Sequence, residues 1–320
     1  MFVREAQRAV LIASPRGFCA GVERAIEVVE RLLAREAPPL YVRREIVHNR
    51  SVVDDLRARG VVFVEELAEV PDGSLVIFSA HGVAPGVWRD AEARGLRVID
   101  ATCPLVTKVH RQVSRHATAG RPIVLIGHAG HDEVLGTMGE APDAIHLVTS
   151  VADVGRLALP VDGPVACVTQ TTLGLDETGE IVEALRQRFS GLIFPDRGDI
   201  CYATQNRQDA VKDLVRHGCG FLLVVGSPNS SNSVRLCEVA ERLGVPARLI
   251  SGPAELPWEE LALQPILGLT AGASAPEHLV QAVATSLAAR GWARREIVTL
   301  AEDVRFRLPP ELEPRPDPRN

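Results

Sequence analysis

The sequence predicts an α/β fold made of three similar small domains with mainly parallel sheets. Short apolar runs typical of buried strands alternate with longer segments of helical periodicity along the whole chain. Each third of the chain also repeats one order, which is strand, loop, cysteine and helix. Alternating strands and helices favour parallel sheets with right-handed crossovers. The composition of the 320 residues, 46% hydrophobic and 24% charged, is that of an ordinary globular protein.

The first copy of the repeat begins with a predicted strand over residues 9–14, which leads to Cys19. The segment after Cys19 is predicted to be helical because apolar residues recur at helical spacing, at Val22, Ile26, Val29 and Leu33. We place the first domain at residues 1–101. The C-terminal segment 280–320 is a candidate to pack back on this domain, and residues 304–308 alternate as an edge strand does.

In the second copy, the strand-like run LRVIDAT leads to Cys103, and Pro104 follows at a position typical of a first helical turn. The third copy is weaker, with GLIFPDRGDI before Cys201 and a helical apolar stripe after it. These copies place the second domain at residues 102–199 and the third at 200–279.

Cysteine positions indicate a metal centre. The six cysteines contain no C-x-x-C pair, and Cys167, Cys219 and Cys237 lie in apolar surroundings, where a thiol packs as a small hydrophobe. The other three occupy equivalent positions at helix starts, where backbone N–H groups favour a thiolate. Three such thiolates suit a metal or an iron–sulfur cluster with one open position. We therefore take Cys19, Cys103 and Cys201 as candidate ligands.

Polar loops follow the other predicted strands in every third of the chain. In open α/β sheets, ligands bind beyond the carboxyl ends of the strands, so these loops are expected to form the site. Imidazole, hydroxyl and amide groups without lysine describe a pocket for a multiply charged oxyanion such as a diphosphate. The side chains concerned include His48, His81, His128, His131, Ser231, Asn232 and Ser274.

Two loop residues invite different interpretations. Ser274 followed by Glu277 reads as a capping box, which is compatible with anion binding because both use free N–H groups at a helix start. Glu133 lies two residues after His131 in a loop of small residues. Most surface glutamates are only solvated, but a lone carboxylate beside imidazoles and cysteines is the best candidate for a general acid.

Charge and motifs exclude several functions. The net charge is −6, from 35 basic and 41 acidic residues, and no block of Lys or Arg supports nucleic-acid or membrane binding. Walker A and G-x-G-x-x-G motifs are missing, which disfavours a nucleotide cofactor. No apolar run approaches 18 residues and no secretory signal is recognisable, so we expect a cytoplasmic protein.

Nine segments in register resemble the LytB family of 4-hydroxy-3-methylbut-2-enyl diphosphate reductases. The resemblance runs from about residue 9 to residue 308 and is far more specific than a single motif. The segments are PRGFCAGVERAIE, VHNRSVVDDL, FSAHGV, DATCPLVTKVH, GHAGHDEVLGT, TQTTL, DICYATQNRQ, GSPNSSNS and TAGASAP.

The resemblance implies the last step of the non-mevalonate (MEP) isoprenoid pathway. An allylic hydroxy-diphosphate is reduced by two electrons and two protons, with loss of water, to isopentenyl and dimethylallyl diphosphates. The family fold is a trefoil of three α/β domains around a central [4Fe-4S] cluster. Three cysteine ligands leave one iron open, and reduced ferredoxin or flavodoxin is the implied electron donor.

The family's functional groups map by motif onto this chain. The cluster ligands are Cys19, Cys103 and Cys201, the proton-delivering acid is Glu133, and Thr171 assists it. Substrate-binding groups fall on His48, His81, His131, Ser230, Asn232 and Ser274, with Ser231 beside them. Two departures are Asp132, where many relatives have proline, and Cys167 in the strand before TQTTL.

The three cysteines are also compatible with two other classes of protein. A zinc hydrolase would bind its metal through the three cysteines, although all-thiolate zinc sites are usually structural. An iron–sulfur redox sensor would use an exposed cluster and a conformational change. The zinc hydrolase would not explain the histidine and serine pocket.

Overall fold

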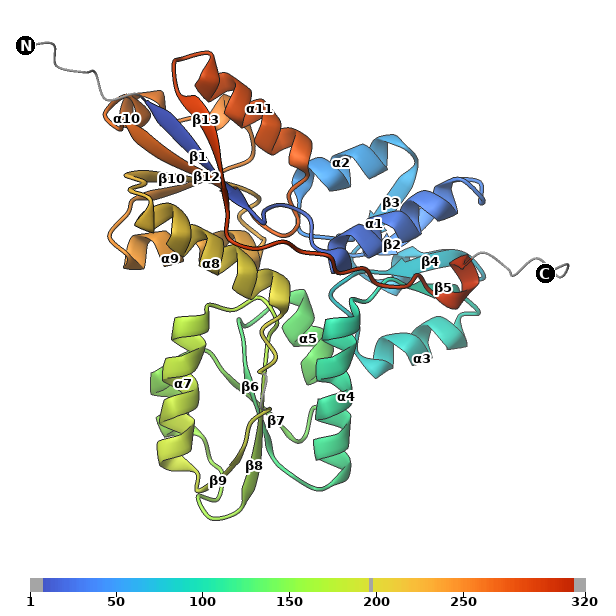
Figure 1. Cartoon of the computed structure of the whole chain (residues 1–320). Coiled ribbons are helices and arrows are strands. Elements are labelled where there is room, and N and C mark those ends of the chain that lie inside the picture. The colour runs from blue at the N-terminus through green and yellow to red at the C-terminus, as the bar shows by residue number, and fades with distance from the viewer. Residues whose placement is uncertain (1–7, 196–197, 314–320) are drawn as a thin grey trace, which may run out of the picture.

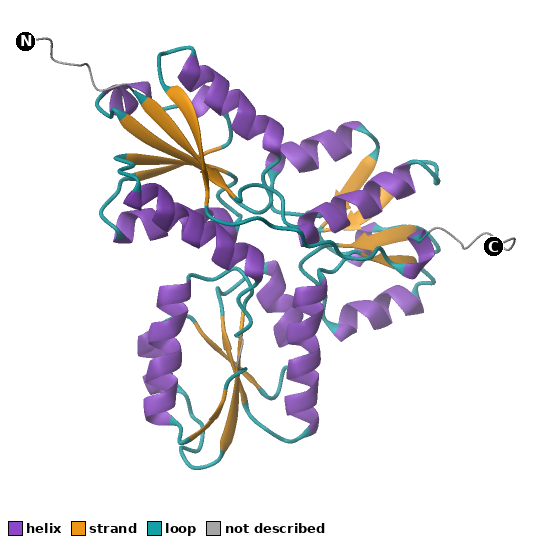
Figure 2. Cartoon of the chain, in the orientation of Figure 1, coloured by secondary structure: helices purple, strands orange, loops and turns teal. Residues whose placement is uncertain are grey.

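The computed structural model describes residues 8–195 and 198–313, which form three separate sheets (Figure 2). The five-stranded sheet runs in the order β11 (Ala247–Ile250), β10 (Phe221–Val225), β12 (Ile266–Ala271), β1 (Ala9–Ser14) and β13 (Ala293–Val298). The second sheet has the order β3 (Val61–Val64), β2 (Leu40–Arg43), β4 (Leu75–Phe78) and β5 (Arg97–Asp100). The third has the order β7 (Ile145–Val148), β6 (Ile123–Ile126), β8 (Pro164–Thr169) and β9 (Gly191–Ile193).

All strand pairs in these sheets are parallel, which confirms the predicted α/β class. Parallel sheets are normally covered on both faces, and here each face carries its own apolar cluster under helices. The helices are α1 (Ala20–Leu33), α2 (Arg50–Ala58), α3 (Pro85–Ala93), α4 (Pro104–Thr118), α5 (Asp132–Met138), α6 (Val151–Arg156), α7 (Leu175–Arg188), α8 (Tyr202–Arg216), α9 (Ser231–Arg242), α10 (Trp258–Ala262) and α11 (Glu277–Ala288). Short 3-10 turns lie at Leu67–Glu69, Pro253–Glu255 and Pro310–Leu312.

Strand β1 does not belong to the sheet that follows it in sequence. The structure corrects the predicted domain of residues 1–101, because β1 lies between β12 and β13 in the five-stranded sheet. This strand is buried on both faces, which suits a central position. Helix α1 then packs its apolar stripe on the second sheet, against Leu40 and Val42. Cys19 therefore lies where the chain crosses from one sheet to another.

The C-terminal segment 280–320 also divides between two parts of the molecule. Helix α11 and strand β13 belong to the five-stranded sheet, whereas Leu308 and Leu312 pack into the apolar cluster under α1. Residues 304–308 form no strand, and the edge strand is β13 instead. We call residues 299–308 the C-terminal arm, which crosses the front of α1 in Figure 1. Residues 1–7 and 314–320 of the predicted domains lie outside the described residues.

The loops at the carboxyl ends of the strands meet at the centre of the molecule, where the three sheets approach one another (Figure 1). One central pocket takes residues from the loops after β1, β2, β4, β5, β6, β8, β10 and β12.

Among the residues that the structure describes, no helix is both long enough and apolar enough to cross a membrane.

Candidate active site

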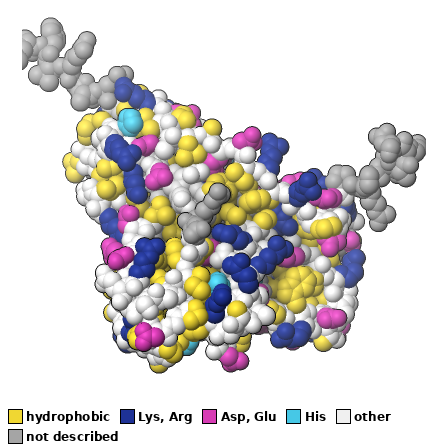
Figure 3. Space-filling view, turned by 60° about the horizontal axis from the view of Figure 1, so that its bottom comes forward, with side chains coloured by type: hydrophobic (Ala, Val, Ile, Leu, Met, Phe, Trp, Pro, Cys, Tyr) yellow, Lys and Arg dark blue, Asp and Glu magenta, His cyan; other side chains and the backbone are white. Residues whose placement is uncertain are grey.

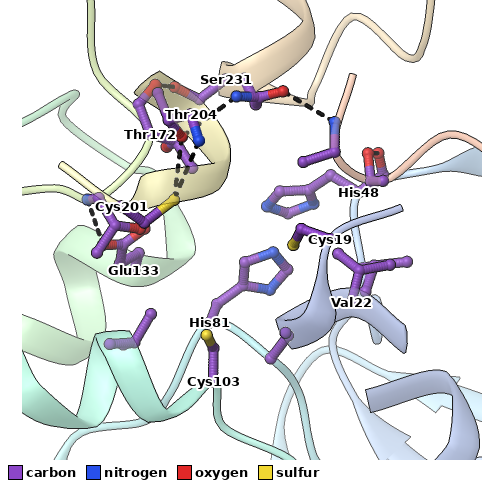
Figure 4. Close-up of a pocket in the computed structure, with 18 of the residues that line it drawn as sticks. Cys19, Val22, His48, His81, Cys103, Glu133, Thr172, Cys201, Thr204 and Ser231 are labelled. Atoms are coloured by element: carbon purple, nitrogen blue, oxygen red, sulfur yellow. Dashed lines mark hydrogen bonds between the residues drawn. The ribbon is translucent and has the colours of Figure 1, made fainter. Parts of the chain in front are cut away.

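Cys19, Cys103 and Cys201 are the N-cap residues of α1, α4 and α8, and all three line the central pocket (Figure 4). The three helices start from different sheets, so convergence of the cysteines is a property of the tertiary structure. Cys201 Sγ lies 3.2 Å from Thr204 Oγ1 and accepts a hydrogen bond from the Thr204 N–H at 3.4 Å. Each sulfur thus lies at a helix start, where the helix dipole favours negative charge.

Gly21 keeps free the space beside the sulfur atoms of Cys19 and Cys103. A Cβ atom on Gly21 would lie 2.6 Å from Cys103 Sγ and 3.8 Å from Cys19 Sγ. Burial raises the pKa of Cys103 to about 12 and that of Cys201 to about 11, and in each case Cys19 adds to the increase. Three partly buried sulfur donors that line one pocket fit a metal centre or an iron–sulfur cluster with three protein ligands.

Three histidines form one wall of the pocket. The rings of His48 and His81 stack with their centroids 4.0 Å apart, and the His131 ring stands edge-on at 5.2 Å from His48. Burial holds the pKa of His81 well below its usual value and lowers that of His131 to about 4. Neighbouring histidines lower both pKa values further. In the empty pocket these two imidazoles are therefore neutral near pH 7.

Glu133 is buried, with 3% of its surface exposed. Its Oε1 accepts a hydrogen bond from the Thr171 N–H at 2.6 Å, and its Oε2 accepts one from the Thr171 hydroxyl at 3.1 Å. Burial raises the pKa of Glu133 to about 7, although both contacts with Thr171 oppose the shift. A carboxyl group with this pKa is available as an acid at neutral pH. The interpretation of Glu133 as a solvated surface residue is therefore wrong.

Hydroxyl and amide groups form another wall of the pocket, next to the start of α8. Ser274 Oγ donates a hydrogen bond to the His48 carbonyl at 2.9 Å and lies 3.3 Å from Ser230 Oγ. Asn232 accepts a hydrogen bond from the Ala273 N–H at 2.8 Å. The predicted capping box at Ser274 does not form, because α11 starts at Glu277 with Pro276 as its N-cap residue and no side-chain cap. Ser274 is left to face the pocket.

The pocket brings together the residues that the sequence proposed for the site, except His128, which is not part of its lining. Thr204 was missed, although it connects Cys201 to Asn232 through its hydroxyl. The position of Thr204, three residues after the N-cap residue Cys201, could have predicted this contact. Glu45 was also missed, and its carboxylate lies 3.2 Å from His48 Nδ1.

A family model described as LytB protein matches residues 10–288. The chain belongs to the LytB family. It is 56% identical to the 4-hydroxy-3-methylbut-2-enyl diphosphate reductase of Azoarcus sp. (strain BH72), over 95% of this chain and 97% of the relative. It is 57% identical to the enzyme of the same name from Ralstonia nicotianae, over 97% of this chain and 96% of the relative.

Solved structures of the family have the same architecture. The E-1-hydroxy-2-methyl-but-2-enyl-4-diphosphate reductase from Plasmodium falciparum superposes with a TM-score of 0.93 at 38% identity. That match covers 96% of this chain and 97% of the other. A second structure, of (E)-4-hydroxy-3-methyl-but-2-enyl diphosphate reductase, has a TM-score of 0.62 at 31% identity, over 88% of this chain and 99% of the other.

The two departures from the usual LytB pattern have different surroundings. Asp132 pairs with Arg44, which directly follows β2, and its other carboxylate oxygen lies 3.8 Å from His48 Nε2. Its negative charge is thus directed at Arg44 and His48. Cys167 is buried in β8, and desolvation raises the pKa of its thiol strongly. This cysteine packs as a core residue away from the pocket.

Replacing Arg207 with methionine is expected to destabilise the fold by about 3–5 kcal/mol, because it removes one partner of a buried ion pair. Arg207 is fully buried and donates hydrogen bonds to Gly17 O at 2.8 Å, Phe18 O at 3.1 Å and Glu302 at 2.9 Å. It thereby holds the Cys19 loop against α8 and the arm. Chemical denaturation measures the effect, with Arg186→Met on the surface of α7 as the control. A change at Arg207 as small as that of the control would contradict this role.

Proposed function

We propose that this chain reduces (E)-4-hydroxy-3-methylbut-2-enyl diphosphate to isopentenyl and dimethylallyl diphosphates. The substrate takes up two electrons and two protons, its C–O bond breaks, and the hydroxyl leaves as water. One observation carries the proposal: three helix-capping cysteines, an oxyanion wall and a buried carboxylic acid line the same pocket. The reaction is the last step of the non-mevalonate isoprenoid pathway.

Cys19, Cys103 and Cys201 would hold a [4Fe-4S] cluster with one iron open to the pocket. When bound, such a cluster supplies electrons and Lewis acidity at the open iron. The space beside Gly21 and the soft donor set are consistent with this cofactor. Electrons come from outside the chain, because its sequence contains no flavin or nicotinamide motif. Reduced ferredoxin or flavodoxin is the proposed donor.

The polar walls would bind the diphosphate and orient the rest of the substrate. His48, His81 and His131 offer ring N–H groups, while Ser230, Ser231, Asn232 and Ser274 offer hydroxyl and amide donors. When the diphosphate is bound by these groups, the allylic hydroxyl would lie between the cysteines and Glu133. The groups that bind the substrate would therefore also position its hydroxyl for proton transfer. Glu133 then donates the proton that leaves with the hydroxyl, and Thr171 holds its carboxyl group in place.

Anaerobic reconstitution with iron and sulfide tests this function against its alternatives. We expect visible absorption, and oxidation of a reduced viologen dye only when the hydroxy-diphosphate is added. A zinc hydrolase would show neither absorption nor dye oxidation. A redox sensor would absorb without turnover, and either of these outcomes would refute the proposal.

Substrate affinity is expected to fall as pH rises through the histidine range. Burial keeps His81 and His131 neutral in the empty pocket, and a bound diphosphate stabilises their protonated forms. Binding therefore takes up protons, which favours the complex at low pH.

His48→Ala or His81→Ala is expected to raise Kd roughly 10- to 100-fold, since a hydrogen bond to a charged group contributes about 1.5–3 kcal/mol.

Calorimetric titration of the reconstituted protein at several pH values measures both effects. His217→Ala is the control, because His217 is exposed on the surface next to α8 and lies outside the pocket. The variants should retain their visible absorption. Unchanged affinity in both His48→Ala and His81→Ala would show that these rings serve only the structure.

A further inference from the structure

Helix α4 presents a row of basic side chains to solvent. Lys108, Arg111 and Arg115 are exposed at intervals of three and four residues, so they share one side of the helix. The opposite side is buried by Val106, Val109 and Val113. Lys108 pairs with the buried Asp199 at 3.4 Å, whereas Arg111 and Arg115 leave the rest of this side of α4 open to solvent.

The C-terminal arm adds two basic residues beside this row. Arg24 Nε donates a hydrogen bond to Arg307 O at 2.7 Å, and Arg24 Nη1 donates one to Thr102 O at 3.0 Å. One guanidinium thus joins the arm to the residue before Cys103, at the start of α4. Arg305 and Arg307 are both exposed on this stretch. We call Lys108, Arg111, Arg115, Arg305 and Arg307 the basic face.

The basic face contrasts with the acidic balance of the whole chain, which has a net charge of −6. Of the arm's two acidic residues, Glu302 is engaged by Arg207 and Asn206, and Asp303 is exposed. Within residues 8–195 and 198–313, neither Arg111 nor Arg115 forms an ion pair. Figure 3 shows Lys and Arg side chains gathered near the middle of one side of the molecule, beside a hydrophobic area.

One end of the basic face lies close to the candidate cluster ligands, and Arg111 and Arg115 continue the face along α4 away from them. Cys103 is the N-cap residue of α4, and Lys108 follows it by five positions, roughly 8 Å along the helix axis. The arm is held to α8, which starts after Cys201, and to α1, which starts after Cys19. A protein seated on this face would thus lie over the starts of all three cysteine-capped helices.

We infer that the basic face is the docking surface for an acidic one-electron carrier protein. The inference rests on the proposed function, in which two electrons must enter one at a time from outside the chain. A carrier has to bind and leave twice in each turnover, so its attraction must be fast and reversible. Complementary charge provides this, because it raises association rates without a large buried interface.

A double charge reversal tests the docking surface. The holoenzyme with Arg111→Glu and Arg115→Glu is compared with wild type, using a reduced acidic ferredoxin as donor at low ionic strength. We expect the KM for ferredoxin to rise on the order of tenfold or more, and calorimetric binding of ferredoxin to weaken in parallel. Added salt should reduce the difference, since exposed charges are screened beyond about 10 Å at 0.1 M.

The matched control reverses Arg242 and Arg295, which are exposed on the domain of the five-stranded sheet and change the net charge equally. This control should leave the KM for ferredoxin within about twofold, as expected for charges outside the contact. Turnover with a small viologen dye should be unchanged in both variants, which separates docking from catalysis. Equal effects of both double reversals, or no effect of the first, would overturn the docking surface. Failure of the dye to support turnover in wild type would instead refute the proposed function, and ferredoxin binding would still test the basic face.

Discussion

Replacing Cys103 with alanine is expected to abolish both the visible absorption and the activity of the reconstituted protein. Cys103 is the N-cap residue of α4, and its sulfur lies with that of Cys19 beside Gly21, in the pocket that Cys201 also lines. Alanine removes one of three protein ligands, and nearby hydroxyl groups are poor substitutes for a thiolate toward iron. The same loss is expected for Cys19→Ala and Cys201→Ala.

The remaining cysteines serve as matched controls. Cys167 and Cys219 are buried in the core, Cys237 lies on α9, and none of them lines the pocket. Their alanine variants should keep the absorption spectrum, the iron content and the turnover rate. An intact cluster in Cys103→Ala, measured by iron content and absorption, would refute the assignment of the ligands.

Glu133→Gln is expected to slow turnover by roughly 10²- to 10⁴-fold, the usual contribution of general acid catalysis. Glutamine keeps the size of the side chain, and its carbonyl oxygen still accepts the Thr171 N–H that now lies 2.6 Å from Oε1. It has no carboxyl proton to donate to the leaving hydroxyl. Substrate affinity should change little, so the loss should appear in kcat with a nearly unchanged Kd.

The pH profile gives a second measurement of the same role. The pKa of Glu133 is raised to about 7 by burial, so its acid form dominates below that pH. In wild type, kcat should therefore fall as pH rises through about 7. Glu133→Gln should lose this limb of the profile, while the exposed control Glu183→Gln should retain it. A rate within a factor of about three of wild type would assign proton delivery to Thr171 or to a bound water.

Local sequence patterns predicted most of the elements but not which sheet each strand joins. The run at residues 9–14 reads correctly as a strand, yet its partners are β12 and β13, from the far end of the chain. Strand periodicity reports which faces are buried, whereas pairing depends on contacts between distant residues. The same limit explains residues 304–308, whose alternation reflects packing of Leu308 on the cluster under α1 rather than strand pairing.

The site was more predictable than the topology. Its residues sit in loops after strands, and parallel strands place such loops at one edge of a sheet. The three equivalent cysteines and the LytB segments therefore identified the pocket lining. Thr204 and Glu45 were missed because their contacts with Cys201 and His48 depend on side-chain directions that no motif expresses.

The sequence by itself determined the α/β class, the cysteine-capped helices and the chemical groups available to a substrate. These properties follow from residue type and short-range spacing. Only the tertiary structure decided the protonation of the site and the position of the basic face. Burial of Glu133, His81 and His131 shifts their pKa values, because a low-dielectric environment disfavours the charged form. Arg24 of α1 joins the backbone of Arg307 to that of Thr102, so the fold of the arm over α1 brings together charges that lie about two hundred residues apart in sequence.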